Sequence, residues 1–282
     1  MLSPSKHAIN RKIGGQAYAP FAVAAGADLW FTVARPPRIT RAKADGNDME
    51  AANDTTNNGP GGRKIAAVIP CYGESGHVGA VVRGAAAAGF PAIVVDDGSP
   101  DGTADEARKA GAAHVEVHEK NAGKGAAMAT GLAKALELGF DAAVLMDGDG
   151  QHDPAELPRF AAAFEAGADV VLGSRMADAG RKMPLVRYLT NRFMSAMLSR
   201  KMGMKATDTQ CGYRLLSRKA AETVLKCRTQ GFAADSEQLL LLARAGFRFA
   251  EVPVSTIYGD EKSKIRPVRD AIKFFAMLRK YR

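Results

Sequence analysis

The sequence predicts an α/β fold with a doubly wound, mostly parallel sheet that carries helices on both faces. Short apolar runs alternate along the chain with longer, alanine-rich segments of helical spacing. The short runs are apolar at nearly every position, which is typical of parallel strands buried on both faces. They span residues 65–70, 92–95, 115–117, 142–146 and 170–172. The helical segments between them span residues 78–88, 103–110, 124–138 and 154–166.

After residue 175 this alternation stops and helical patterns dominate. Residues 184–202 and 268–281 place apolar positions at helical spacing among lysines and arginines, which predicts two basic amphipathic helices. Residues 235–245 are helical in pattern and residues 247–257 strand-like. The apolar stripes of the basic helices can pack on the sheet while their basic sides meet lipid headgroups, and we favour peripheral membrane contact.

By composition the chain has three parts. Residues 1–63 are expected to be a weakly ordered leader and linker, because residues 42–62 are polar and rich in Gly, Asn and Asp. Residues 64–265 contain the strand and helix patterns and form the main domain. Residues 266–282 are expected to form a C-terminal helix packed on that domain or on a membrane surface.

The composition is that of a globular protein, with 46% apolar and 24% charged residues in a chain of 282. The longest apolar stretch, residues 19–34, is interrupted by Asp28, so we expect neither a membrane span nor a signal peptide. Three widely spaced cysteines suit neither a zinc site nor a disulfide framework, which favours the cytoplasm.

Charge is distributed unevenly along the chain. Residues 1–174 contain 16 Lys/Arg and 21 Asp/Glu, a net charge of −5. Residues 175–282 contain 23 and 9, a net charge of +14. Such asymmetry predicts an acidic partner for the C-terminal part: phosphates, anionic lipid or nucleic acid.

Two aspartates follow the strand-like run 142–146 directly. Asp147 and Asp149 are separated by a glycine and followed by Gln151 and His152. A strand end presents such side chains at the carboxyl edge of the sheet, where open α/β sheets bind ligands. Oxygen ligands suit a hard cation such as Mg²⁺ or Mn²⁺, whereas a surface turn is the alternative explanation.

A second aspartate pair, Asp96 and Asp97, ends the run 92–95. We assign this pair to a base imide and ribose hydroxyls, and the nearby Ser99 and Asp101 to turn formation. Neither the dinucleotide pattern G-x-G-x-x-G nor the phosphate-loop pattern G-x-x-x-x-G-K-[ST] occurs, which disfavours a conventional dehydrogenase or P-loop enzyme.

Several motifs occur in a characteristic order. They are PCYGE (70–74), VVDDGSPDGT (94–103), NAGKGAA (121–127), DGDGQH (147–152) and GSR (173–175). With these, the chain resembles family-2 glycosyltransferases of the GT-A, nucleotide-diphospho-sugar transferase, fold. TDTQCGYRLLSRKAA (207–221) and the Ser-Lys pair at 263–264 are similar to the branch that uses polyprenyl phosphates, the dolichyl-phosphate mannosyl- and glucosyltransferases and their bacterial relatives.

The resemblance implies a role for each matching residue. The nucleotide sugar would be bound by Pro70, Tyr72, Glu74, Asp96, Asp97, Lys124 and Asp147. Mg²⁺ or Mn²⁺ would be bound by Asp147, Asp149 and Gln151. The catalytic set would be Asp149, Arg175, Asp208, Arg214 and Lys264, with the three cations meeting phosphates of donor or acceptor. The family usually has Thr or Ala at the position of Cys71 and Asn at that of Gly73.

Two further positions have competing explanations. Lys124 opens a helix whose backbone amides can receive an anion, although an ordinary glycine-rich helix entry is equally compatible. His152 follows the metal motif, and we expect it to support the ligands through a hydrogen bond rather than to bind the metal.

We therefore expect a metal-dependent, inverting glycosyltransferase that moves a hexose from a nucleotide sugar of UDP-glucose or GDP-mannose type to polyprenyl phosphate. It would act in the cytoplasm, peripherally at the inner face of the membrane, with no nucleic-acid partner. A phosphate acceptor needs no strong base, since its second pKa is roughly 6.

Three alternatives stay open. A hydroxyl acceptor on a glycan or lipid would need a base, with Asp208 and Asp235 as candidates that could equally be caps. A sugar-phosphate nucleotidyltransferase would need a glycine-rich, basic first loop, which is missing. A non-enzymatic basic module for nucleic acid or membrane would leave the acidic motifs unexplained.

Overall fold

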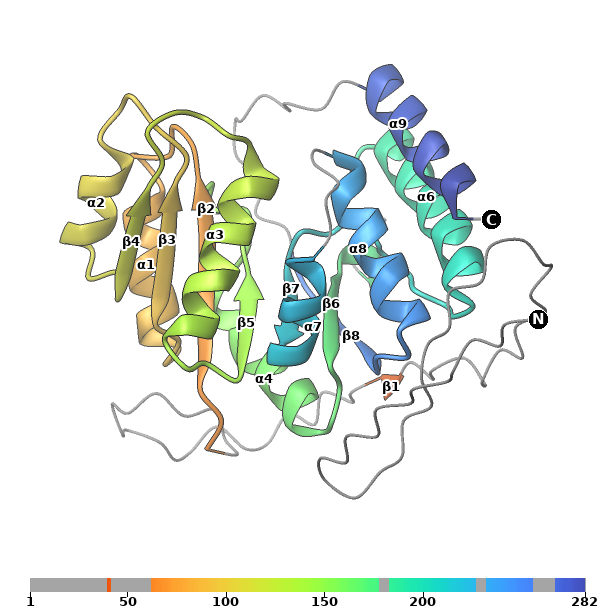
Figure 1. The fold of residues 1–282 in the computed structure, drawn as a ribbon, viewed down its shortest axis with the longest axis horizontal. Helices are drawn as coiled ribbons and strands as arrows, with labels where there is room; N and C mark the ends of the chain where they lie inside the picture. The colour runs from red at the N-terminus through yellow and green to blue at the C-terminus, as the bar shows by residue number, and fades with distance from the viewer. Residues whose placement is uncertain (1–39, 42–61, 178–182, 227–231, 256–266, 282) are drawn as a thin grey trace, which may run out of the picture. The chain divides into compact units, whose positions relative to one another are not determined.

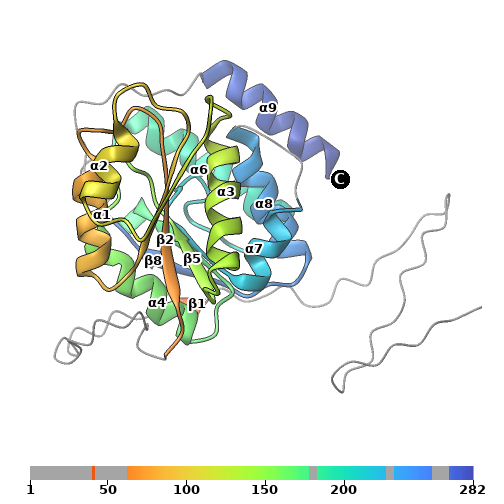
Figure 2. The ribbon, with the colours of Figure 1, turned by 60° about the vertical axis from the view of Figure 1, so that its left-hand side comes forward.

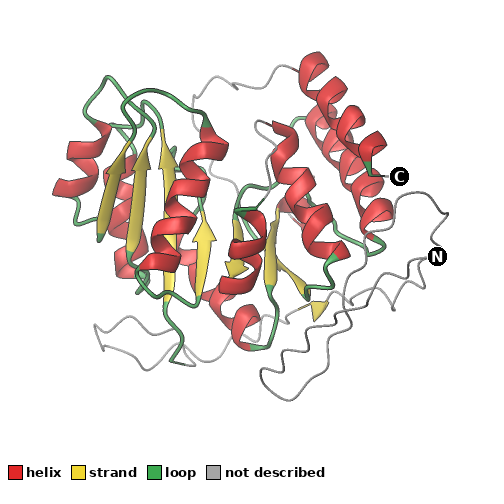
Figure 3. Cartoon of the chain, viewed as in Figure 1, coloured by secondary structure: helices red, strands yellow, loops and turns green. Residues whose placement is uncertain are grey.

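The computed structural model describes residues 40–41, 62–177, 183–226, 232–255 and 267–281. By its internal contacts the chain divides into two units, Met1–Arg35 and Pro36–Arg282, and all described residues belong to the second. That unit is built on a mixed sheet flanked by helices (Figures 1 and 3).

Eight strands form the sheet in the order β1-β8-β6-β7-β5-β2-β3-β4. They are β1 (Thr40–Arg41), β2 (Ile65–Cys71), β3 (Ala92–Asp96), β4 (His114–Val117), β5 (Ala142–Leu145), β6 (Val170–Ser174), β7 (Arg214–Ser217) and β8 (Phe249–Pro253). Neighbouring strands are parallel, except that β7 runs antiparallel to both β5 and β6. The sequence-based α/β class with a mostly parallel sheet is thus confirmed.

Helices cover both faces of the sheet. They are α1 (Val78–Ala87), α2 (Thr103–Lys109), α3 (Lys124–Glu137), α4 (Leu157–Glu165), α6 (Leu185–Met202), α7 (Arg218–Val224), α8 (Phe232–Arg244) and α9 (Pro267–Lys280). Short 3₁₀ turns, η1 (Pro154–Glu156) and η2 (Arg175–Ala177), precede α4 and follow β6. Figure 2 shows α1, α2 and α4 on one side of the sheet and α3, α7 and α8 on the other.

Each face of the sheet has its own apolar core. One core joins the strands to buried residues of α1 and α4, and the other joins them to buried residues of α3, α6, α7, α8 and α9. The central strand β2 is buried along nearly its whole length because both layers cover it. On α3, a Cβ added at Gly131 would lie 2.4 Å from Cγ1 of Val68, so only glycine allows this close approach of helix and strand.

The structure extends the sequence-based assignment in three places. β7 and the first turn of α7 lie within the 207–221 motif, for which no element was predicted. Thr40–Arg41, part of the predicted leader, adds β1 in parallel beside β8. The predicted helix 154–166 divides into η1 and α4, with the Asp153 side chain capping η1 by accepting from the Ala155 N–H.

Helix α6 is buried along only one half. Its later turns bury Met194, Leu198 and Met202. Its earlier turns expose Leu185, Val186, Leu189 and Phe193, each more than half accessible to solvent. The predicted apolar stripe of this helix therefore packs on the domain only toward its C-terminal end. Among the helices in the described segments, none has the length and apolar character that a membrane crossing requires.

Candidate active site

The candidate site lies where the order of the strands reverses. From β2 the chain continues to β3 and β4 on one side, and then crosses back to β5 on the other side of β2. The loops after β2 and β5 therefore diverge at the carboxyl edge of the sheet, which is the usual binding crevice of open α/β sheets. Tyr72 follows β2, and Asp147 and Asp149 follow β5.

The loop after β5 is held in shape by its own polar groups. The Asp147 N–H donates to Nδ1 of His152 at 3.0 Å, and the Gln151 N–H donates to Oδ1 of Asp149 at 2.9 Å. A Cβ added at Gly148 would lie 2.3 Å from Sγ of Cys71, so the loop rests directly on the end of β2. Glycine between the two aspartates is therefore required by packing.

His152 stabilises this loop. Its ring stacks on Tyr213, with centroids 4.7 Å apart and an interplanar angle of 15°. Burial lowers the pKa of His152 to about 4, so the ring is neutral at pH 7. Because Nδ1 accepts the Asp147 N–H, the ring proton sits on Nε2. This is the hydrogen-bonded supporting role that the sequence predicts for His152.

Lys124 pairs with the first aspartate of the motif. It is the first residue of α3, and its Nζ lies 2.5 Å from Oδ1 of Asp147. Burial is the largest single effect and would raise the pKa of Asp147, but the charge and hydrogen bond of Lys124, together with His152 and Arg214, lower this pKa. Burial would likewise lower the pKa of Lys124, yet Asp147 and Asp235 together raise it. Both groups are charged at neutral pH.

Arg214 brings a second cation to the same place. It opens β7 and pairs with Leu145 and Leu172, so it enters at the carboxyl edge of the parallel strands. Its side chain is 2% exposed, and its Nη2 lies 3.5 Å from Oδ1 of Asp235. Nε and Nη1 of Arg214 are buried and have no hydrogen-bond partner among the residues that the structure describes. Unpaired buried donors are costly and rare, so this guanidinium is a candidate to bind a ligand.

The residues of the motif fit a divalent cation that shares its coordination with a substrate. Asp147, Asp149 and Gln151 supply oxygen donors, as Mg²⁺ and Mn²⁺ prefer. In the described part of the chain, no three His, Cys, Asp or Glu side chains come together as a complete metal site. Two carboxylates completed by substrate phosphates are the arrangement typical of Mg²⁺ in phosphate chemistry.

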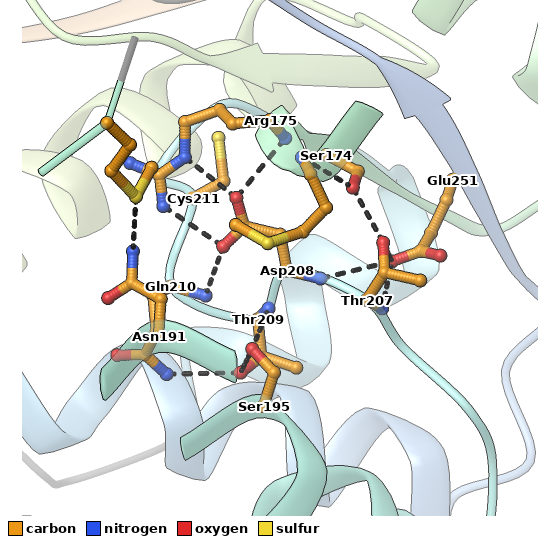
Figure 4. A network of polar contacts seen from close by, with 12 residues as sticks. Ser174, Arg175, Asn191, Ser195, Thr207, Asp208, Thr209, Gln210, Cys211 and Glu251 are labelled. Carbon is orange, nitrogen blue, oxygen red and sulfur yellow. Dashed lines mark hydrogen bonds and ion pairs between the residues drawn. The ribbon is translucent and has the colours of Figure 1, made fainter. Parts of the chain in front are cut away.

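Arg175 and Asp208 form a separate, fully engaged ion pair (Figure 4). Nε of Arg175 donates to Oδ2 of Asp208 at 2.7 Å, and Nη2 donates to Oδ1 at 3.0 Å. The Arg175 and Gln210 N–H groups also donate to this carboxylate, which is 0% exposed. Asp208 therefore fixes the orientation of Arg175.

The pair continues into a buried polar network. Glu251 on β8 accepts from the Thr207 N–H at 2.6 Å and from the Thr207 hydroxyl at 3.2 Å. Ser174 and Thr207 share a hydroxyl hydrogen bond of 2.6 Å (Figure 4). Burial raises the pKa of Glu251 above its ordinary value. This network ties the segment before β7 to β6 and β8.

The aspartate pair at the end of β3, which the sequence assigns to the nucleotide sugar, accepts hydrogen bonds from neighbouring loops. Asp96 accepts from the Ser99 and Ala104 N–H groups, at 2.9 and 3.2 Å. Asp97 accepts from the Ala122 and Gly123 N–H groups at 2.9 and 2.7 Å, and pairs with Nδ1 of His118 at 2.6 Å. Both aspartates are almost fully buried. Their carboxylates organise the loops around α2 and α3.

Residues of the loop after β2 are more accessible. Tyr72 is 43% exposed, and Pro70 and Glu74 are half-buried. The Gly73 N–H donates to Oγ of Ser99, and the Ser75 N–H donates to Asp101, which gives these two residues the turn-forming roles that the sequence predicts. Lys264 lies outside the described residues.

The sequence matches the family model described as "Glycosyl transferase family 2" over residues 66–225. This match covers more than half of the chain and includes both aspartate pairs. The chain is a family 2 glycosyltransferase.

Relatives of this glycosyltransferase are similar over most of their length. It is 32% identical over 204 residues to the polyprenol monophosphomannose synthase of Mycolicibacterium smegmatis, covering 68% of this chain and 77% of the relative. It is 31% identical over 215 residues to the UDP-N-acetylglucosamine–dolichyl-phosphate N-acetylglucosaminyltransferase of Methanococcus voltae, covering 69% and 86%. It is 35% identical over 178 residues to the undecaprenyl-phosphate mannosyltransferase of Micrococcus luteus, covering 58% and 71%.

Solved structures share the GT-A fold of this glycosyltransferase. Glucosyl-3-phosphoglycerate synthase from Mycobacterium tuberculosis with phosphoglyceric acid has a TM-score of 0.63 at 19% identity, covering 87% of this chain and 88% of that one. The same enzyme with Mn²⁺, UDP-glucose and phosphoglyceric acid has a TM-score of 0.59 at 20% identity, covering 78% and 80%.

Sequence reasoning on this glycosyltransferase missed two supporting residues. Glu251 interrupts the apolar strand β8, and an acid inside a buried strand is a signal that could have been read. His118 follows β4 and carries no pattern of its own. Its contact with Asp97 depends on how β3 and β4 pair, which no local motif encodes.

Proposed function

We propose that this glycosyltransferase moves one hexosyl residue from a nucleotide sugar of UDP-glucose or GDP-mannose type to a polyprenyl phosphate. The observation that carries the acceptor class is the state of Asp208. It is fully buried, and each of its oxygens already accepts hydrogen bonds, chiefly from Arg175. A hydroxyl acceptor requires a base, which Asp208 is not placed to be, whereas a phosphate monoester is already anionic and loses its second proton at roughly pH 6. The names of the relatives support the same acceptor class.

For the donor, we assign Mg²⁺ or Mn²⁺ to Asp147, Asp149 and Gln151. When bound, such an ion supplies charge stabilisation to the departing nucleoside diphosphate. Glucosyl-3-phosphoglycerate synthase, which shares the fold, has been crystallised with Mn²⁺ and UDP-glucose. The exposed ring of Tyr72, with Pro70 and Glu74, is assigned to the nucleoside.

The cations of the chain would act on phosphates. Arg214 presents two unpaired nitrogens, and Asp208 holds Arg175 in one orientation. Planar guanidinium groups fixed in this way give directed contacts to phosphate oxygens. Asp96 and Asp97 are assigned to holding the loops that face the donor rather than to direct contact with it.

The transfer then requires positioning more than proton chemistry. An acceptor phosphate oxygen attacks the anomeric carbon in line, and a new carbon–oxygen bond forms as the bond to the donor's β-phosphate breaks. The electron pair leaves with the nucleoside diphosphate. A single displacement of this kind inverts the anomeric configuration.

The exposed part of α6 is assigned to the membrane. Leu185, Val186, Leu189 and Phe193 are exposed on its earlier turns. Residues 183–206 contain five Lys/Arg and no Asp or Glu, so an anionic surface complements them. An apolar face beside such cations is typical of peripheral attachment to anionic lipid. We place this contact at the cytoplasmic leaflet.

The test of the acceptor is Mn²⁺-dependent release of nucleoside diphosphate from UDP- and GDP-sugars, with and without polyprenyl phosphate. We expect release to require the lipid phosphate. A hydroxyl acceptor is the second candidate, because the partly exposed Asp235 could serve as its base. Transfer to a hydroxyl-bearing acceptor that Asp235→Asn abolishes would replace our proposal with that one.

The membrane assignment is tested by co-sedimentation with vesicles of anionic or neutral lipid. Leu189→Ser/Phe193→Ser should lose binding to anionic vesicles. Leu138→Ser, a control at a similarly exposed leucine just after α3, should keep it. Equal binding of all three proteins would contradict the role of α6.

A further inference from the structure

Lys124 occupies an electrostatically unfavourable position in its own helix. It is the first residue of α3, where the helix dipole favours anions and disfavours cations, and no acidic residue follows in the first turn. A lysine there gains nothing from the helix. Its favourable interactions come instead from across the site, where Nζ lies 2.5 Å from Oδ1 of Asp147.

The ammonium group therefore already occupies the carboxylate that we assign to the metal. Lys124 is also attracted by Asp235 and repelled by Arg214. A divalent ion that binds Asp147 must displace the ammonium group, which then stands beside both the dication and the Arg214 guanidinium. With two cations and a dication close together, binding of the metal alone is disfavoured.

A nucleoside diphosphate would reverse this balance. Its phosphates bring negative charge to the site and offer the displaced ammonium group a new partner. Lysine suits such an exchange because its charge sits on a flexible four-carbon stem, unlike the rigid fork of Arg214. Metal and nucleotide would then each favour the binding of the other.

Resting on the proposed metal assignment, we propose that Lys124 is a resident counter-cation that makes metal binding depend on the nucleotide. In the empty site it neutralises Asp147 and keeps the divalent ion out. When the metal arrives with a nucleoside diphosphate, Lys124 transfers from Asp147 to the phosphates. Lys124 thereby couples two ligands that bind side by side.

The test measures Mn²⁺ affinity directly, by the electron paramagnetic resonance signal of free Mn²⁺ during titration, without and with saturating UDP or GDP. Without nucleotide, Lys124→Met should bind Mn²⁺ about 10-fold more tightly than the wild type. With nucleotide it should bind more weakly than the wild type, so the coupling between metal and nucleotide shrinks. Lys124→Arg keeps the charge and should retain the low affinity for metal alone.

The matched control is Lys120→Met, an exposed lysine just before α3 that should leave both affinities unchanged. Unaltered or weaker Mn²⁺ binding by Lys124→Met in the absence of nucleotide would overturn the inference. Asp149→Asn separates this failure from failure of the metal site itself. If Asp149→Asn still binds Mn²⁺ normally, the metal assignment is wrong; if only the Lys124 variants behave like wild type, the counter-cation role alone is wrong.

Discussion

The loops after β3 and β5 each begin with two closely spaced aspartates at the same edge of the sheet, yet the two pairs have different surroundings. Asp96 and Asp97 are almost fully buried and accept backbone N–H groups from neighbouring loops. Asp147 and Asp149 are only half-buried, and the main partner of Asp147 is the ammonium group of Lys124. The first pair is satisfied by a fixed framework, and the second by a cation that can be exchanged.

The difference lies in the neighbours rather than in the aspartates. Beside Asp97, the chain before α3 turns so that two consecutive N–H groups point at one carboxylate. Beside Asp147, the first residue of the same helix is Lys124, which pairs with this carboxylate. The buried Arg214 pairs with Asp235. The Asp97 carboxylate therefore shapes the loops around it, whereas the Asp147 carboxylate is paired with a single flexible lysine side chain.

The largest effect on turnover should come from a change in the Asp147 and Asp149 pair. Asp149→Asn removes a charged ligand without removing volume, so we expect turnover with Mn²⁺ to fall about 10³-fold. Thermal stability should change little, since this side chain sits at a strand end outside the core. Asp105→Asn, at an exposed ion pair on α2, should keep full activity as the control. Wild-type turnover by Asp149→Asn would contradict the comparison.

The same Asp-to-Asn change at Asp97, whose carboxylate is held by backbone N–H groups, should mainly reduce the stability of the fold. Asp97→Asn turns an acceptor oxygen into a donor that faces N–H groups of Ala122 and Gly123. Loss of these charge-assisted bonds should lower the free energy of unfolding by about 3 kcal/mol. Urea denaturation followed by circular dichroism measures this change. A variant of native stability that has lost only donor affinity would show that Asp97 binds the nucleotide.

The glycines next to the two aspartate pairs, Gly98 and Gly148, differ in the atoms that surround them. A Cβ at Gly98 would meet backbone atoms of Lys120 and Asn121, whereas a Cβ at Gly148 would meet the Cys71 side chain. Gly148→Ala should therefore destabilise the protein by about 2 kcal/mol, as overpacking does, and Cys71→Ala should relieve it. The same double variant built with Gly98→Ala should show no relief. Thermal unfolding of the three single and two double variants checks the coupling.

The smallest effect concerns pH. His152 is neutral in the folded protein, with its pKa lowered to about 4, while an unfolded histidine titrates near 6.5. The unfolded state thus binds more protons between these values, so stability is lost as pH falls below 6.5. We expect His152 to account for about 2 kcal/mol of lost stability between pH 7 and 5. His152→Asn keeps an acceptor for the Asp147 N–H and should flatten this slope; an unchanged slope would assign it to other groups.

Much of the fold was predictable because β2, β5 and most of β3 and β6 are apolar runs separated by helical segments. β7 was not, for a local reason: it has four residues, and a charged Arg214 opens it. Nothing in that pattern indicates a strand buried on both sides. The exposed half of α6 was also not predictable, since Leu189 and Leu198 look alike in sequence and only packing against α8 separates them.

The site was predictable in part. The Asp147 motif was recognised because glycine-flanked carboxylates after a buried strand are poor core material. The contact of Lys124 with Asp147 was not, because it joins residues from two different elements 23 positions apart in the chain. Asp96 and Asp97 were assigned to the ligand because sequence shows the carboxylates but not the N–H groups that point at them.

The position of β7 has a further consequence for hydrogen exchange. Its amides lie between β5 and β6, bonded within the centre of the sheet, and such amides exchange only when a protein unfolds globally. The first amides of α3 have no acceptor within the helix and exchange through local opening. Arg214 is therefore attached to the slowest-exchanging backbone of the domain, and Lys124 to a helix end that opens independently. Arg214 and Lys124 thus differ in the rate of hydrogen exchange expected at their backbone amides, and not only in their side chains.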